Sequence, residues 1–129
     1  MNAGQQLNPI LKDLVSGEVY QVVRLPKTDV TGKIIAPQVP YIVYIPITTT
    51  PETSQYGYTG HDWSRVQIDV YHSSYDKCDD LANQVIIAIN NHIQPSEMGS
   101  RQHLYDNDTK LWRQSFDVEF FTEIPTPTP

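Results

Sequence analysis

The sequence predicts one α+β domain, in which helices cover one face of a mostly antiparallel sheet. Three observations support this fold class. The length of 129 residues fits a single domain. Residues 65–71 alternate polar and apolar side chains, as a half-buried strand does. Residues 78–92 repeat apolar side chains with helical period. The predicted order is α-β-β-β-α-β-β, and consecutive strands favour antiparallel pairing.

The first segment predicts a short helix followed by a strand. Asn8 suits the N-cap and Pro9 the first helical position. Gly17 is placed to end the helix in a left-handed conformation. Residues 18–25 are rich in β-branched and aromatic side chains, which favour a strand, and Pro26 ends it.

Two connections flank the second predicted strand. Residues 26–40 contain a dipeptide that favours a turn, Thr31-Gly32, and are expected to be irregular. Residues 41–47 form an apolar run, which predicts a strand covered on both faces. Pro46 cannot donate to a ladder and therefore indicates an edge, a bulge or a bend. Residues 48–62 are polar and predict a long mobile loop, a feature that is usually functional.

The second half predicts a strand, the main helix and a hairpin. In residues 65–72 the core-facing side chains are Val66, Ile68 and Val70, and the outward ones are Arg65, Gln67 and Asp69. Ser73 or Ser74 caps the helix, which ends near Asn90-Asn91. Residues 95–101 are expected to link it to a hairpin of residues 102–105 and 110–121. The domain is expected over residues 1–123, with residues 124–129 as a flexible Pro-Thr tail.

The charge balance excludes several classes of partner. The formal net charge is -6 and the nine basic residues are scattered, so neither a grip on nucleic acid nor membrane binding is expected. The single cysteine excludes an intrachain disulfide.

The chain is expected to hold no catalytic, cofactor or metal site. The four histidines show no ligand spacing; they are His61, His72, His92 and His103. Cys78 lies on the apolar stripe of the main helix, which indicates an inert buried thiol. The acidic residues Asp76, Asp79 and Asp80 are accounted for by the helix dipole. His61 and Asp62 are adjacent on an extended segment, so they point apart and cannot act as a relay with Ser64 or Arg65.

The polar segment at residues 48–62 carries the interface prediction. A disordered connection is one interpretation. The functional one is an arm that becomes ordered against a neighbouring subunit or partner. The predicted protein-interface residues are Tyr44, Gln55, Tyr56, Tyr58 and His61.

The order of elements resembles a known family. The segments that carry the resemblance are residues 40–44, 65–71, 73–82 and 112–121. Together they resemble the tail completion proteins of long-tailed bacteriophages, also called tail terminator or tail-to-head joining proteins. The similarity runs from about residue 7 to residue 122, and the chain departs from it by its Pro-Thr tail and by a longer stretch between residues 25 and 40.

The resemblance implies a structural virion protein that is assembled in the host cytoplasm. Such proteins form a hexameric ring at the head-proximal end of the tail, where they stop growth of the tube and join it to the head. The implied partners are further copies of the chain, the tail tube protein and the head connector. DNA passes through the lumen without specific binding. The family has no catalytic residues and no cofactor.

Two other functions remain open from the residues alone. One is a monomeric module that binds a peptide on a sheet edge. The other is a small enzyme of unrecognised type, which would need a pocket of converging titratable groups.

Overall fold

The computed structural model describes residues 2–22, 27–28, 30–35, 39–107 and 109–123. The predicted tail at residues 124–129 lies outside these described residues. The elements, in chain order, are α1 (Ala3–Leu11), the 3-10 helix η1 (Lys12–Leu14), β1 (Val19–Gln21), β2 (Lys27–Thr28), β3 (Ile34–Ile35), β4 (Tyr41–Ser54), β5 (Gly57–His72), α2 (Tyr75–His92), β6 (Ser96–Met98), β7 (Gln102–Asp106) and β8 (Leu111–Glu123).

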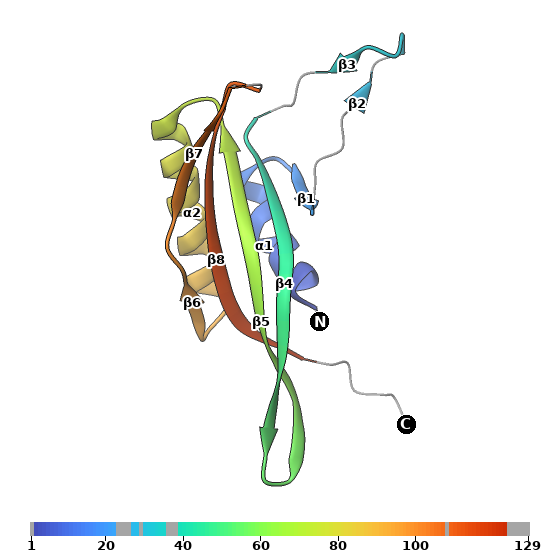
Figure 1. The fold of residues 1–129 in the computed structure, drawn as a ribbon, viewed down its shortest axis with the longest axis vertical. Helices are drawn as coiled ribbons and strands as arrows, with labels where there is room; N and C mark the ends of the chain where they lie inside the picture. Colours follow the sequence, from blue (N-terminus) through green and yellow to red (C-terminus); the bar gives the residue numbers. More distant parts are fainter. Residues whose placement is uncertain (1, 23–26, 29, 36–38, 108, 124–129) are drawn as a thin grey trace.

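A six-stranded sheet forms the body, and both helices cover one of its faces (Figure 1). The order is β1-β4-β5-β8-β6, with β7 also paired to β8. The pairs β4–β5, β5–β8 and β7–β8 are antiparallel, which confirms the α+β prediction. The expectation that consecutive strands pair antiparallel is wrong for β1, which runs parallel to β4. Residues 22–40 separate the two strands in the sequence, and a connection of this length permits parallel pairing.

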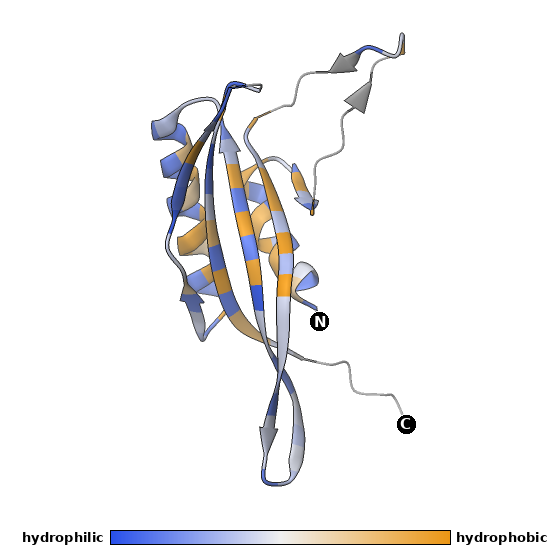
Figure 2. Cartoon of the chain, in the orientation of Figure 1, coloured by the Kyte–Doolittle hydropathy of each residue, from blue (hydrophilic) through white to orange (hydrophobic). Residues whose placement is uncertain are grey.

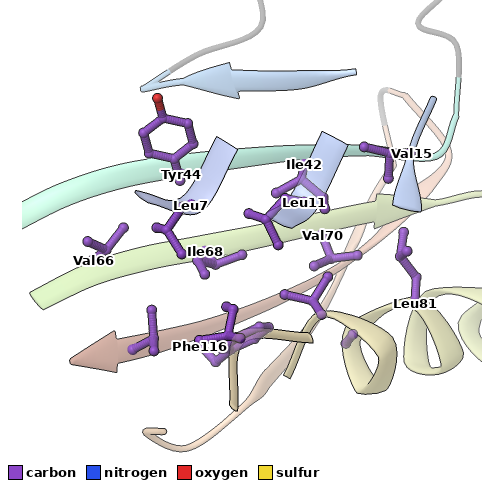
Figure 3. Packing of buried hydrophobic residues seen from close by; sticks show 14 of the residues in the cluster. Leu7, Leu11, Val15, Ile42, Tyr44, Val66, Ile68, Val70, Leu81 and Phe116 are labelled. Atoms are coloured by element: carbon purple, nitrogen blue, oxygen red, sulfur yellow. The ribbon is translucent and has the colours of Figure 1, made fainter. Parts of the chain in front are cut away.

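The core lies between the helices and the sheet (Figure 3). Leu7 and Leu11 of α1 are fully buried against Ile42 and Ile68 of the central strands. Burying a side chain of this size stabilises the fold by roughly 1.5–3 kcal/mol. Figure 2 shows hydrophobic and hydrophilic residues alternating along β5 within the body, as predicted. One predicted outward residue of β5, Asp69, is instead buried, and it accepts a hydrogen bond from Gln67 Nε2 at 3.1 Å.

The first helix begins earlier than predicted. Asn2, rather than Asn8, is the N-cap, and its side chain accepts from the Gln5 backbone while Gln5 bonds back to the Asn2 backbone. This capping box satisfies the first free N–H groups six residues upstream of the predicted start. Pro9 therefore lies inside α1. Gly17 has φ of 84°, which confirms the predicted left-handed position after the helix.

The C-terminal half follows the prediction closely. Ser74 caps α2, and its hydroxyl accepts from the Lys77 N–H at 3.2 Å. The predicted face of β8 is confirmed, since Phe116, Val118 and Phe120 are buried on the helix side. Within the predicted linker at residues 95–101 the structure adds the short strand β6, which pairs with β8.

The largest difference lies at residues 48–62, where the predicted mobile loop is wrong. These residues continue β4 and begin β5, and they form a hairpin that extends beyond the body of the sheet (Figure 1). We call residues 51–62 the arm. Its Thr-rich, polar composition is typical of loops, but a two-stranded ladder exposed on both faces has no apolar alternation to reveal it.

Candidate protein–protein interface

The arm is built as a tight hairpin. Ser54 pairs with Gly57 around a turn at Gln55 and Tyr56, and Gly57 has φ of 104°. A residue of positive φ after a tight turn closes a hairpin, and glycine reaches it without steric cost. The ladder shifts register between Pro46 and Thr48 and again between Pro51 and Thr53. The first shift adds one residue to β4 relative to β5, as a β-bulge does, and a bulge increases the local twist of the two strands.

Side chains hold the arm together. The Tyr58 phenol donates to Asp62 Oδ1 at 2.6 Å, and the Thr59 hydroxyl donates to the Glu52 carbonyl at 3.2 Å. The carboxylate beside Tyr58 raises the pKa of its phenol to about 12. In the part of the chain that the structure describes, β8 reaches only as far as the pair between Glu123 and His61. Beyond this pair the arm is therefore a two-stranded projection that is held in shape by contacts between its own residues.

The predicted interface residues fall into two groups. Gln55, Tyr56 and Tyr58 lie at or near the tip, where Tyr56 is 90% exposed and Tyr58 45% exposed. His61 lies at the base of the arm, partly buried, with its ring 6.4 Å from that of Phe121. Exposed aromatic side chains at the end of a projection are suitable anchors for a partner surface.

Tyr44 lies in the core rather than at the surface, and its place in an interface stays a prediction. It is 6% exposed and belongs to the main core beneath α1. Residues 41–44 of the apolar run are buried, whereas Ile47 is 44% exposed, so the predicted coverage of both faces holds only for the first part of the run. Tyr71, a further aromatic on the neighbouring strand, is partly buried on the opposite face of the sheet.

That opposite face, which neither helix covers, is a second candidate surface. We call it the open face. Tyr41 stacks on Tyr71 there, with ring centroids 4.5 Å apart and an interplanar angle of 11°. Tyr20 meets Tyr41 edge-on at 6.3 Å. Val43 belongs to the same apolar cluster. Sequence alternation gave no sign of this cluster, because in β4 the apolar run is continuous and does not distinguish the two faces.

Two hollows meet on the open face. One of about 310 Å³ lies along β4 and β5, and one of about 490 Å³ lies beside β7. Both are lined by Tyr71 and Arg113. The hydrogen bond between these two side chains raises the pKa of the Arg113 guanidinium, so this charge is permanent. Tyr41 is itself buried, so the open face offers the partly exposed Tyr71 next to a guanidinium, a combination common at protein interfaces.

The remaining chemical candidates are distributed over the structure. Cys78 is fully buried, and its thiol donates to the Val70 carbonyl at 3.3 Å. Burial raises the pKa of this thiol, which keeps it protonated and unreactive. His72 and His92 make local contacts with Ser73 and the Ala88 carbonyl. Over residues 2–22, 27–28, 30–35, 39–107 and 109–123, no group of three or more His, Cys, Asp or Glu side chains is arranged to hold a metal ion.

The acidic residues of α2 have separate roles. Asp79 accepts from the buried Gln114 amide at 2.9 Å and from Arg101 at 3.3 Å. Asp76 lies in the first turn, where it complements the positive end of the helix. The predicted absence of a catalytic relay concerned Arg65 as well. Its guanidinium pairs with Asp117 across β5 and β8. Within the described chain, neither helix is both long and apolar enough to cross a bilayer.

Comparison with known proteins supplies the family. The model of the family described as tail completion protein gp17 matches residues 11–123. The chain belongs to this family. It is a structural protein of phage tails, and the predicted resemblance is confirmed. The matched range contains every strand of the body and the whole arm, and it leaves out nearly all of α1.

The fold also has a neighbour among solved structures. A chain in the virion of a native gene transfer agent particle aligns at 15% identity with a TM-score of 0.49. The alignment covers 92% of this chain and 90% of that chain. Among curated proteins no match was found.

Proposed function

We propose that this tail completion protein forms a hexameric ring at the head-proximal end of the tail, where it ends tube growth and joins the tail to the head. The observation that carries the proposal is the arm. A two-stranded hairpin that projects from its own body and ends in exposed aromatic side chains is suited to contact another molecule.

The geometry suits contacts between unlike surfaces. A closed ring of identical copies needs head-to-tail contacts, in which one face of each subunit meets a different face of the next. The arm and the open face are two such surfaces. The arm provides Tyr56 and Tyr58 at its end, and the open face provides the partly exposed Tyr71 beside Arg113.

The charge distribution suits passage of DNA through the ring. The net charge is -6, and the arm contains no lysine or arginine. An acidic surface repels the phosphate backbone and a neutral surface does not attract it, so DNA moves past without being bound. The proposed partners are other copies of the chain, the tail tube protein and the head connector. The role is structural, and none of its steps requires catalysis or a cofactor.

The first test is assembly of an arm variant. Residues 51–62 are replaced by Asn-Gly, a dipeptide that closes a two-residue hairpin between the paired residues Thr50 and Trp63. The body is expected to keep its thermal stability, while light scattering shows loss of the species at six times the 14.7 kDa subunit mass. Purified tail tubes should no longer acquire end-bound density in electron micrographs.

A point-substitution pair sharpens this test. Tyr56→Ser removes the most exposed tyrosine of the arm, and Ile87→Ser removes an exposed apolar side chain from α2, where 59% of it is accessible. Only the first substitution is expected to weaken the ring and lengthen the tubes. A ring that tolerates loss of the arm, or that fails equally with Ile87→Ser, overturns the role of the arm.

A further inference from the structure

The two edges of the sheet differ in the main-chain groups that they offer. Along β4 the Ile42 N–H bonds outward to the carbonyl of Glu18, the residue before β1, so even-numbered residues of this part of β4 face that edge. β1 pairs no further than Tyr44, and the next outward position is Pro46. Proline has no N–H, so the first position beyond β1 has no donor.

A second outward position without an N–H donor lies further along β4. The register shift after Pro46 places Pro51 opposite Asp62. The Asp62 carbonyl faces β8, where it accepts from Thr122 Oγ1 at 3.5 Å, so its partner Pro51 faces away from β5. Two outward positions of this edge therefore lack a donor. Prolines at such positions are a common protection against addition of a further strand.

The edge formed by β7 has no such protection. The Asp117 carbonyl faces away from β5, since it accepts from the Gly99 N–H at 2.7 Å. Arg113 is also an odd-numbered residue of β8, so its backbone N–H and C=O groups face β7. They bond with those of its partner residue, Leu104. The neighbouring residues His103 and Tyr105 consequently direct N–H and C=O groups away from the sheet. Among the described residues, β7 pairs with β8 alone.

Aromatic rings line this edge on the helix side. Tyr75 lies 5.5 Å from His103 and 5.2 Å from Trp112, measured between ring centroids. Tyr105 lies 5.2 Å from the same Trp112. Tyr75 is 43% exposed and Tyr105 46% exposed. An added strand would therefore gain main-chain hydrogen bonds and cover apolar surface together, which is how extended peptides bind sheet edges.

The sequence of the chain contains a segment that fits this edge. Residues 124–129 read Ile-Pro-Thr-Pro-Thr-Pro. In an extended strand alternate residues direct their N–H groups to the same side. Ile124, Thr126 and Thr128 would then donate from one edge, and the prolines would occupy the other. Such a strand pairs on one side only, so it can add to a sheet and end it.

The distance that the segment can span decides which copy of the chain supplies it. β8 ends at Glu123, ten residues from Arg113, where β7 is paired. Ten residues of strand span about 33 Å, whereas the six residues 124–129 span at most about 20 Å. These six residues therefore fall short of β7 in their own subunit, and a second copy must provide them.

We propose that residues 124–129 of one subunit add as a strand to the β7 edge of the next, next to His103 and Tyr105. In antiparallel pairing the Thr126 and Thr128 side chains lie beside the two rings, a pairing of β-branched and aromatic groups that stabilises sheets. The contact joins two different surfaces, which is the head-to-tail type of contact that a closed ring requires. The inference rests on the proposed ring and names one of its contacts.

Hydrogen exchange of single amides tests this contact in the full chain. In the assembled protein the His103 and Tyr105 amides should exchange about tenfold or more slowly than in the variant Thr126→Pro/Thr128→Pro, which lacks two of the donors. Leu104, already bonded to β8, should not differ. The matched control, Thr126→Val/Thr128→Val, keeps the donors and the β-branch and should retain protection.

The solution mass of the same samples separates this contact from the ring itself. A ring that forms without protection of His103 and Tyr105 overturns the contact and leaves the ring standing. If the chain stays monomeric at all concentrations, the ring fails, and a peptide of residues 122–129 at millimolar concentration then decides the contact. Protection of His103 and Tyr105 by that peptide supports the edge as its site; its absence, or protection at β6 instead, refutes it.

Discussion

The ring of Tyr44 lies against the backbone of Gly4, so closely that a Cβ atom at position 4 would stand 2.8 Å from Tyr44 Oη. α1 therefore crosses β4 at a glycine, because only a residue without a side chain leaves room for the phenol. The tyrosine belongs to the packing of helix on sheet, and its polar end still reaches the rim of the core (Figure 3).

This packing predicts that Tyr44 acts on stability. Tyr44→Ala should lower the free energy of unfolding by about 3 kcal/mol, because it leaves a cavity under α1. Tyr56→Ala, at the exposed tip of the arm, should change it by no more than about 0.5 kcal/mol. Denaturant unfolding followed by circular dichroism measures both. Equal losses for the two variants would contradict the assignment of Tyr44 to the core.

A second prediction concerns the pKa of Tyr58. Its phenol remains protonated up to a pKa of about 12, because Asp62 accepts its hydrogen bond. Asp62→Asn should return the pKa toward the ordinary value of 10.0. The raised pKa means that the bond persists at neutral pH and is lost as the pH rises through about 12. The Tyr58 ring resonances, titrated by NMR, report this directly.

The matched control for that titration is Glu52→Gln, which removes one negative charge from the same arm. Its effect on the Tyr58 pKa should be small, because Glu52 makes its contact to Thr59 through the main-chain carbonyl. If both variants lower the Tyr58 pKa equally, the charge of the arm causes the shift and the hydrogen bond does not.

A third prediction concerns the buried thiol. Cys78 should resist alkylation by iodoacetamide at pH 8 in the folded chain and react fully in denaturant, since burial excludes the reagent and raises the thiol pKa. The stability that comes from the protonated thiol is present below pH 9.0, its ordinary pKa, and is lost as the pH rises through the folded pKa. Ile87→Cys supplies a positive control, because position 87 is 59% exposed. Rapid labelling of Cys78 at the rate of that control would show that the helix opens.

A fourth prediction separates Asp79 from its neighbour. Asp79→Ala leaves the Gln114 amide, which is 1% exposed, without the acceptor that it now has at 2.9 Å. Loss of such a buried partner costs about 1–3 kcal/mol. Asp80→Ala removes the same charge from an exposed position and should cost no more than about 0.5 kcal/mol. Thermal unfolding compares the two, and similar melting temperatures would contradict the role of Asp79.

Several elements could be predicted because their signals are local. Ser74 caps α2 where the sequence places it, and Gly17 takes the left-handed conformation. The alternation in β5 and β8 correctly places Val66, Ile68 and Phe116 in the core. The family could be predicted as well, because it follows from the order of these same elements.

The candidate interface was only half predictable. Tyr56 and Tyr58 are exposed on the arm as expected, but the arm is a ladder and the sequence indicated a loop. Polar residues exposed on both faces produce no periodic pattern, so pairing of distant strands alone reveals the hairpin. The Tyr41–Tyr71 stack could not be predicted for a related reason, since a continuous apolar run does not show which residue faces which side.

By itself the sequence determined the class of the fold, the helical and strand periods, the positions of caps and turns, and the acidic charge. These properties depend on neighbours within a few residues. Tertiary structure decided which side of β4 holds Tyr44, that β1 runs parallel to β4, and that His103 and Tyr105 face outward from an unpaired edge. Those outcomes depend on how segments far apart in the chain pair, and a register shift of one residue would reverse the sides that Tyr44, His103 and Tyr105 face.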